Sequence, residues 1–319
     1  RPDAENVDLS GGNSMSTTVK TVVITGASSG IGRAAVARMT QAGWKVFATV
    51  RKEQDGVDLR SSFGVDVVPV IMDVTDPSSV RAAAERVAFL LDGAALDGLV
   101  NVAGVGKMRP VETMTHDDLQ DVFDINLFGQ VEVSRAFLPL LRAARGRIVN
   151  ITSIGAHIAI PFGGLINASK SAFAILSDTL RLELHPFRIH VAAVEPGAIR
   201  TPAVQKTLGD VEGVIRTFSP SGVTHYATML RAFARRAYER EMNGSSPDVV
   251  ADSIHHALTA RRPRCRYRVG KHATALAALA AFLPDRLLDA VRFRIAGMPS
   301  KFGVLPATEQ PACRVRRVE

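Results

Sequence analysis

The stretch TVVITGASSGIG, residues 21–32, decides how this sequence is interpreted. Its first five residues are apolar or β-branched and predict a short buried strand. Gly26, Gly30 and Gly32 follow, and residues 33–42 are helix formers that end at Gly43. A glycine loop between a strand and a helix brings backbone N–H groups close to an anion such as a pyrophosphate. The same spacing also fits a plain tight turn, so the surrounding sequence is needed to distinguish the two.

The pattern of strand, turn and helix repeats along the chain. Apolar runs at 45–50, 65–74, 96–104, 146–153 and 188–197 predict further strands, and residues 78–91, 116–142 and 167–184 predict helices. Buried strands that alternate with helices predict an α/β fold: a Rossmann-type, doubly wound parallel sheet with helices on both faces, in a single domain. Ligands of such sheets bind beyond the carboxyl ends of the strands. We therefore expect the functional residues at those ends.

The length of 319 residues suits one α/β domain with appendages. Residues 1–14 are polar and are expected to be a disordered extension or a remnant of cloning, residues 15–270 the Rossmann domain, and residues 271–319 a helical, basic extension. Residues 199–246 mix Thr, Gly, Ser and Pro with helical pieces, and we expect them to form a substrate lid. The apolar tract 273–283 is too short to span a bilayer.

Charge and cysteine content argue against several classes of protein. Cys265 and Cys313 lie far apart and without a histidine pattern, which disfavours a disulfide scaffold or a metal site and favours a reducing, cytoplasmic compartment. The net charge is +8, and many of the cations follow residue 260. They are not interleaved with aromatic residues, so a solvated basic surface is favoured over nucleic-acid binding. Apolar residues at helical spacing between 276 and 291 leave peripheral contact with an anionic membrane as an alternative.

Functional residue types follow two later strands of the predicted sheet. Asp73 and Val74 come directly after one strand, and the turn Asn101 to Gly104 follows the next. In a parallel sheet these ends lie beside the glycine loop, where the adenine ring and ribose of a dinucleotide are held. The glycine loop is therefore interpreted as a dinucleotide site rather than as a plain turn.

From about Val19 to Thr201 the chain resembles the short-chain dehydrogenase/reductase family. Thr25, Gly26, Gly30, Ile31 and Gly32 match its glycine motif, Asp73 its adenine-side acid, and Asn101, Ala103 and Gly104 its structural turn. Pro196 and Gly197 match its proline-glycine element, and Thr201 stands where the family contacts the nicotinamide carboxamide. The subgroup that it resembles most includes hydroxysteroid and retinol dehydrogenases and related bacterial reductases.

The charge after the second strand predicts the cofactor preference. An acid there binds the ribose 2′-hydroxyl of NAD, whereas a cation favours the 2′-phosphate of NADP. Arg51 and Lys52 occupy this place, with no carboxylate before Glu53, which favours NADP(H) over NAD(H). The expected cofactor-binding residues are Gly26, Ser28, Ser29, Gly30, Ile31, Gly32, Arg51, Asp73, Val74, Asn101, Ala103, Gly104, Lys170, Pro196, Gly197 and Thr201.

The resemblance also implies a proton relay made of a serine, a tyrosine, a lysine and an asparagine. Ser153 matches the serine, Asn126 the asparagine, and Lys170 the lysine. The tyrosine position, four residues before Lys170, is Ile166, and no tyrosine occurs between residues 1 and 225. An isoleucine can neither give nor take a proton, and an engineered replacement is one explanation of it.

Three residues are candidates for the missing proton donor. His157 lies four residues after Ser153 and has a suitable intrinsic pKa, although it fits equally well as a wall of the substrate pocket. Tyr226 and Tyr238 lie in the predicted lid and are weaker candidates, because the lid would have to bring them inward.

Three interpretations of the function follow from this gap. The first is an NADP(H)-dependent oxidoreductase whose proton comes from His157, Lys170, water or the substrate. The second is a redox-neutral catalyst, such as an isomerase, dehydratase or cyclase, that reuses the dinucleotide site. The third is a non-catalytic homologue that binds NADP(H). A positioned acid or base contributes about 10²- to 10⁴-fold in rate, so its loss weakens catalysis without preventing cofactor binding.

The partners are predicted more weakly. The apolar stretch 154–165 and the lid favour a hydrophobic alcohol or ketone as the substrate. The family resemblance implies a homo-oligomer that pairs through the helices predicted at 116–142 and 167–185.

Overall fold

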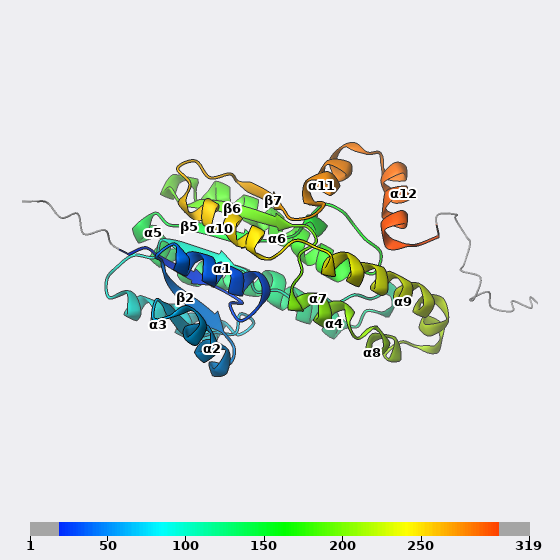
Figure 1. The fold of residues 1–319 in the computed structure, drawn as a ribbon, viewed down its shortest axis with the longest axis horizontal. Coiled ribbons are helices and arrows are strands. Elements are labelled where there is room, and N and C mark those ends of the chain that lie inside the picture. The colour runs from blue at the N-terminus through cyan, green and yellow to red at the C-terminus, as the bar shows by residue number, and fades with distance from the viewer. Residues whose placement is uncertain (1–18, 300–319) are drawn as a thin grey trace, which may run out of the picture.

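The structure is a computed structural model that describes residues 19–299. The extension predicted for residues 1–14, and the part of the C-terminal extension from 300 to 319, lie outside the described residues. Within the described range the predicted α/β architecture is confirmed (Figure 1).

One parallel sheet of seven strands forms the centre of the molecule, in the order β3-β2-β1-β4-β5-β6-β7. The strands are β1 (Thr21–Ile24), β2 (Lys45–Val50), β3 (Val67–Ile71), β4 (Gly98–Asn101), β5 (Arg147–Ile151), β6 (His190–Pro196) and β7 (Arg266–Val269). The order reverses between β1 and β4, and that is where a doubly wound sheet opens a crevice for its ligand. The glycine loop after β1 lies at this point.

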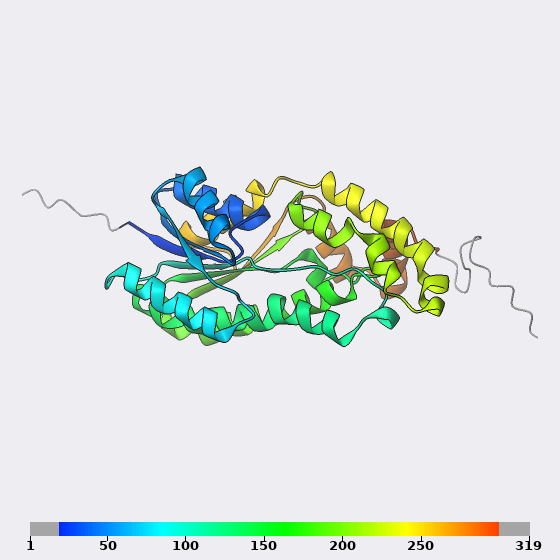
Figure 2. The same cartoon turned by 90° about the horizontal axis from the view of Figure 1, so that it is seen from below.

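Helices cover both faces of the sheet, which Figure 2 shows edge-on. One face carries α1 (Gly30–Gln41), α2 (Glu53–Phe63) and α10 (Asp248–Thr259), and the other carries α3 (Pro77–Leu91), α5 (Gly129–Ala144) and α6 (Gly164–Glu183). Each face has its own apolar cluster, which explains why the strands between them are apolar in continuous runs.

The seventh strand was not predicted from the sequence. β7 reads RYRV, and only Tyr267 of its four residues is fully buried. It is the edge strand, so its arginines reach solvent and hide the apolar pattern that identifies the central strands.

The long helix predicted at 116–142 is interrupted. It consists of α4 (His116–Phe123), one π-helical turn (Asp124–Phe128) and α5, which continues past Pro139 to Ala144. π-Turns inside helices are frequent at functional sites, because they redirect a side chain without ending the helix. The redirected side chain here is Asn126.

The predicted lid is mostly helical. It contains α7 (Pro202–Leu208), α8 (Val211–Arg216) and α9 (Pro220–Met242), and the chain ends its described part with α11 (Ala273–Phe282) and α12 (Asp285–Ala296). These helices lie together at one end of the molecule (Figure 1). The lid helices have a third apolar cluster, centred on Phe218, Leu230 and Phe233, to which Phe162 and Ala296 also belong. No helix within residues 19–299 is long and apolar enough to cross a membrane.

Candidate active site

The glycine loop after β1 has the geometry of an anion cradle. Gly26 and Gly30 adopt left-handed φ angles of +60° and +54°, which favour glycine. A Cβ on Gly26 would lie 2.9 Å from the Ala103 Cα, and one on Gly32 only 2.1 Å from the Gly26 carbonyl oxygen. Neighbouring backbone atoms therefore leave no room for a side chain at Gly26 or Gly32. The loop places the start of α1 at the crevice.

The start of α1 leaves backbone donors free for an anion. Ser29 is the N-cap residue with extended backbone, but its side chain makes no capping hydrogen bond. The first N–H groups of a helix have no partner inside the helix and carry the positive end of the helix dipole. Together with Ser28, Ser29 and Ile31, this turn fits the pyrophosphate of a dinucleotide.

Thr25 and Asn101 hold the floor of the crevice. The Thr25 hydroxyl accepts hydrogen bonds from the backbone N–H of Val102 (2.8 Å) and of Ala103 (3.0 Å), which ties the end of β1 to the end of β4. The Asn101 amide donates to Asn150 Oδ1 (2.8 Å) and to the hydroxyl of Ser134 (3.0 Å). Both residues are buried and shape the site from below.

Asp73, at the end of β3, is held in one orientation. Its Oδ1 accepts hydrogen bonds from the backbone N–H (2.9 Å) and the hydroxyl (2.8 Å) of Thr75. Its own N–H donates to the Ser79 hydroxyl (3.0 Å). Val74 is buried, and its carbonyl oxygen would lie 2.5 Å from a Cβ on Gly129, so the adenine-side turn packs directly on the start of α5.

On the other side of the glycine loop, Arg51 and Lys52 follow β2 and are exposed. Glu53, the next residue, already belongs to the first turn of α2. Across the crevice, Thr201 caps α7, and its Cβ would lie 3.2 Å from a Cβ on Gly30. Pro196 ends β6, and Gly197 fits only without a side chain, because a Cβ there would meet the Lys271 carbonyl oxygen at 2.3 Å.

Lys170 is buried in the middle of this arrangement. It is 7% exposed, and its Nζ donates to the Ile151 carbonyl oxygen at 2.8 Å. Burial lowers the pKa of Lys170 to about 8, because the charged ammonium loses its hydration. The amine therefore exchanges its proton near neutral pH, unlike an ordinary surface lysine.

Asn126 lies next to Lys170 through Gly104. A Cβ on Gly104 would lie 3.2 Å from Asn126 Oδ1 and 3.4 Å from Lys170 Nζ. The absence of a side chain at Gly104 therefore lets both polar groups lie close to the backbone of this turn. The Asn126 amide is anchored: it donates to the Val105 carbonyl oxygen (2.9 Å) and the Ser169 hydroxyl (3.0 Å), and it accepts from the Val105 N–H (2.8 Å).

Ser153 lies two residues after Ile151, just past the end of β5. Its hydroxyl accepts a hydrogen bond from the Gly155 N–H (3.0 Å), which leaves its own proton to donate. Of the predicted relay residues, Ser153 thus follows a strand, Asn126 lies in the π-helical turn and Lys170 lies in α6.

Ile166 points toward the lid. A Cβ on Gly106 would lie 3.2 Å from Ile166 Cδ1 and 3.0 Å from the Thr207 hydroxyl, so the isoleucine side chain, the loop after β4 and helix α7 come together. Ile166 lies one helical turn before Lys170 on the same face of α6. The position at which the resemblance implied a tyrosine therefore holds an apolar side chain beneath the lid.

The structure does not bring His157 or Tyr226 to this face. His157 Nε2 lies 2.7 Å from Oε1 of the buried Glu195, and His157 lines a hollow with Ala168 and Ser171 of α6. The Tyr226 hydroxyl donates to Glu112 Oε2 (2.7 Å), and this bond raises the pKa of Tyr226. Both side chains have partners elsewhere, which disfavours them as proton donors at the Ile166 position.

Sequence reasoning missed one buried group, Arg109, which joins the loop after β4 to the lid. Its only trace in the sequence is indirect: Asp118 and Thr115 form a capping box at the start of α4, and Asp118 is the partner of Arg109. Within residues 19–299 there is no group of three or more His, Cys, Asp or Glu side chains that could hold a metal ion.

Comparisons with known proteins agree with this geometry. Residues 20–211 match the family model described as short chain dehydrogenase. Human Retinol dehydrogenase 5 is 37% identical over 289 residues, covering 88% of this chain and 90% of that protein. Among solved structures, a short-chain dehydrogenase from Streptomyces avermitilis has a TM-score of 0.67 and 28% identity, covering 89% of this chain and 97% of that chain.

A second solved structure is a short chain dehydrogenase from Burkholderia cenocepacia in complex with NADP, with a TM-score of 0.64 and 26% identity over 87% of this chain and 97% of that chain. The family model covers more than half of this chain, and the fold and the glycine loop are those that the resemblance implied. This chain therefore belongs to the short-chain dehydrogenase family, a family of oxidoreductases that bind an NAD(P)(H) dinucleotide.

Proposed function

We propose that the chain is an NADP(H)-dependent oxidoreductase that interconverts a long apolar alcohol and its carbonyl compound. One observation carries the proposal: the side chains of Asn126 and Lys170, from two separate elements, meet at Gly104, and Ser153 lies just past the end of the neighbouring strand β5. The name of the human relative, Retinol dehydrogenase 5, indicates a long apolar alcohol as the substrate of that protein. We propose the same substrate class here.

We propose Lys170 as the source of the proton in carbonyl reduction. The dinucleotide, when bound, supplies the hydride. Ser153 holds the substrate oxygen through its free hydroxyl proton, and the Lys170 ammonium, with a pKa of about 8, gives a proton to that oxygen directly or through one water. The buried amine thus performs alone what a tyrosine and a lysine perform together in the family's usual relay.

Arg51 and Lys52 support the proposed preference for NADP(H). Both are exposed at the end of β2, where the 2′-substituent of the adenosine ribose lies in a doubly wound fold. A 2′-phosphate gains a charge-assisted hydrogen bond from a guanidinium, whereas a 2′-hydroxyl gains little.

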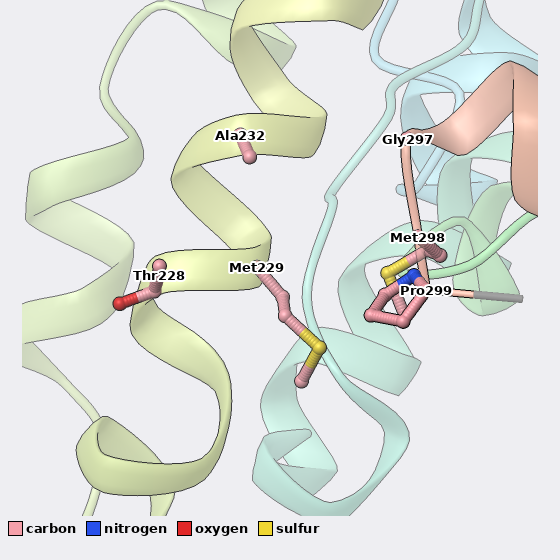
Figure 3. Close-up of a pocket in the computed structure, with 6 residues that line it drawn as sticks. All are labelled: Thr228, Met229, Ala232, Gly297, Met298 and Pro299. Atoms are coloured by element: carbon pink, nitrogen blue, oxygen red, sulfur yellow. The ribbon is translucent and has the colours of Figure 1, made fainter. Parts of the chain in front are cut away.

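The lid supports the proposed apolar substrate. A hollow of about 350 Å³ lies between α9 and the chain after α12, lined by Met229, Ala232, Met298 and Pro299 among others. Figure 3 shows the Met229 side chain pointing from α9 toward Met298 and Pro299. Methionine side chains adapt their shape, which suits a wall that closes on a flexible hydrocarbon.

The test compares the chain with Ile166→Tyr and with Ile166→Phe, which adds the same ring without a hydroxyl. NADPH and NADH affinities are measured first by titration calorimetry, followed by NADPH consumption with all-trans-retinal. We expect NADPH to bind more tightly than NADH, slow reduction by the unchanged chain, and a gain of about 10²- to 10⁴-fold in Ile166→Tyr only. Absence of NADPH binding would refute the proposal, and equal rates in the two variants would refute the assigned role of position 166.

Ile166 itself favours a second candidate function, a dinucleotide-binding protein without net redox chemistry. Binding of NADPH together with turnover in Ile166→Tyr alone would favour a non-catalytic homologue. Conversion of a substrate without NADPH consumption would instead favour an isomerase, dehydratase or cyclase.

We also propose that the chain forms a homo-oligomer through α6 and the π-helical turn. Ile175 and Leu182, seven residues apart on one face of α6, are 67% and 63% exposed, and Phe128 of the π-helical turn is 59% exposed. Light scattering should give the mass of a dimer or tetramer for the unchanged protein and a lower mass for Ile175→Asp. A monomeric mass for both proteins would contradict the proposal.

A cytoplasmic location with peripheral membrane contact through α11 and α12 is our remaining proposal. Phe282 is 85% exposed and Leu287 is 58% exposed, with the exposed Arg286 between them. Flotation with vesicles that contain phosphatidylserine should recover the protein, and Phe282→Ser should reduce the recovery. Equal recovery of both proteins would exclude this surface.

A further inference from the structure

We propose that Arg109 is a positioning residue that holds the lid, residues 199–246, closed over Ile166 and thereby sets the affinity for the substrate. The proposal rests on the proposed function only in taking the lid as a wall of the substrate site. The contact of the lid with the body of the domain is a property of the chain by itself.

Arg109 is a buried arginine whose two ends bind different parts of the molecule. Its side chain is 7% exposed. One nitrogen, Nη1, forms an ion pair with Asp118 on α4, and the other, Nη2, donates to the hydroxyl of Thr217 in the turn between α8 and α9. The guanidinium also lies 5.6 Å from the ring centroid of Phe218. The guanidinium therefore bridges the body and the lid, and we call Arg109, Asp118 and Thr217 the latch.

Asp118 is a firmly fixed anchor for this bridge. Burial disfavours its charge, but hydrogen bonds from Thr115, Lys107 and Arg109 outweigh this effect and lower the pKa of Asp118 to about 2. The carboxylate is thus ionised at any pH well above 2. The latch does not open with ordinary changes of pH, so its role is to position the lid rather than to switch it.

The backbone of Arg109 reaches a third part of the site. Its N–H donates to the Phe162 carbonyl oxygen (2.9 Å), just before the start of α6. Phe162 has a left-handed φ of +62°, rare for a bulky residue, and its ring packs edge-on against Phe233 of α9 at 5.4 Å. One residue therefore connects α4, the lid and the segment that leads to Ile166 and Lys170.

Arg109 of the latch lies in the same loop as Gly106, which contacts the Ile166 position. Gly106, three residues before Arg109, is the point at which Ile166 and Thr207 of the lid come together. If the turn at Thr217 moves away from Arg109, α8 loses this polar attachment to the loop, and α7 keeps its contact at Gly106. The second bridge, from Tyr226 to Glu112, is exposed and contributes less.

Lysine cannot replace this arginine fully. A lysine at position 109 still pairs with Asp118, but its compact ammonium cannot also reach Thr217 and stack on Phe218. A methionine keeps the volume and loses both polar contacts, while Asp118 keeps Lys107 and Thr115 as partners. These two variants separate the ion pair from the bridge.

The test measures amide hydrogen exchange and retinal kinetics for the unchanged protein, Arg109→Lys and Arg109→Met, with Arg135→Met as the control. Arg135 is a surface arginine on α5, 74% exposed and paired with Glu132. We expect exchange in residues 202–218 to rise about tenfold in Arg109→Met and less in Arg109→Lys, with β1, β4 and β5 unchanged. The control should match the unchanged protein.

The kinetic result should show a split between binding and chemistry. KM for all-trans-retinal should rise about tenfold in Arg109→Met, measured in the Ile166→Tyr background, while NADPH affinity and kcat stay within about twofold. Unchanged exchange in the lid, or an equal rise throughout the sheet, would overturn the latch. The exchange measurement needs no substrate, so a failure of the proposed function shows separately as absent turnover.

Thr217→Val provides a milder second variant in case Arg109→Met folds poorly. It removes one hydrogen bond of the bridge and leaves the Arg109–Asp118 ion pair in place. Lid exchange should rise in this variant too, by less than in Arg109→Met. A Thr217→Val protein with the exchange of the unchanged chain would contradict the bridge.

Discussion

The cofactor half of the molecule, residues 19–198 together with α10 and β7, and the lid half, residues 199–246 together with α11 and α12, are built by different kinds of contact. In the cofactor half, the site is formed by backbone and by glycines that admit close approach, as Gly26 and Gly32 do. In the lid half, attachment combines the apolar contact of Phe162 with Phe233 and single polar side chains, such as Thr217 and Tyr226, that reach residues more than 100 positions away in sequence. Close backbone packing tolerates no added side chain, whereas side-chain contacts can be lost one at a time.

The two halves also differ in how they are buried. The sheet has an apolar cluster on each face, and many members are fully buried. The lid cluster is smaller and includes several half-buried residues, such as Met229 and Tyr226. A small cluster opens at a lower free energy than the core of the sheet. We therefore expect the lid to move as a unit while the cofactor half stays folded.

Gly32→Ala should give the largest effect on cofactor binding and tests the cofactor half. The new Cβ would lie 2.1 Å from the Gly26 carbonyl oxygen, which neither backbone segment can avoid. NADPH affinity should fall by about 100-fold or more, or roughly 3 kcal/mol, in a calorimetric titration. Gly43→Ala is the control, because a Cβ there has no neighbour within 4 Å and only its φ of +77° resists substitution. Equal losses in both variants would refute the close-approach explanation.

A pair of phenylalanine truncations should separate the two halves. Phe137 lies in the core beneath the sheet and is 0% exposed, and Phe162 lies in the lid cluster and is 9% exposed. Phe137→Ala should lower the free energy of global unfolding by about 3–5 kcal/mol. Phe162→Ala should lower it less and should increase hydrogen exchange chiefly in the lid. The comparison fails if both variants change exchange in the same set of residues.

Lys170 predicts a pH dependence confined to the cofactor half. Burial lowers its pKa from the ordinary 10.5 to about 8, so between these values the unfolded state binds more protons than the folded state. Stability without cofactor should therefore rise as the pH increases from about 8 to about 10.5, by an amount on the order of 3 kcal/mol. Chemical denaturation at several pH values measures this slope. Lys170→Met should remove it, and a slope that persists in the variant would assign it to another group.

Arg51→Asp should give the smallest effect and tests the rim of the cofactor half. The exposed guanidinium is proposed to bind a 2′-phosphate, so its reversal should weaken NADPH binding by about tenfold, or roughly 1.4 kcal/mol, and strengthen NADH binding. Arg60→Asp makes the same change of charge at the last turn of α2 and should alter neither affinity by more than about twofold. Equal losses of NADPH affinity in both variants would mean that Arg51 acts only through its charge at a distance and not through a direct contact with the 2′-phosphate.

Much of the fold could be predicted from the sequence because its signals are local. The strands of the central sheet are short apolar runs, and the glycine loop joins one of them to a helix. β7 was missed because an edge strand with alternating arginines has no such run. The π-helical turn at Asn126 was missed because its five residues fit a regular helix equally well, and only packing against Val105 and Ser169 selects the turn.

The candidate site was named from the family pattern. The structure places the side chains of Asn126 and Lys170 at Gly104, and Ser153 just after β5. The orientation of His157 could not be predicted from the sequence, because it depends on Glu195, a partner 38 residues away on β6. Arg109 could not be found at all, since its burial depends on the lid closing over it.

By itself, the sequence determined the Rossmann-type sheet, the dinucleotide site and the absence of a tyrosine at position 166, because these depend on residue types at fixed local spacing. Only the tertiary structure decided which way His157 and Tyr226 point, how far the pKa of Lys170 falls, and that Arg109 joins α4 to the lid. Each of these depends on burial and on partners that are distant in the sequence. Only the complete fold brings such partners together in space.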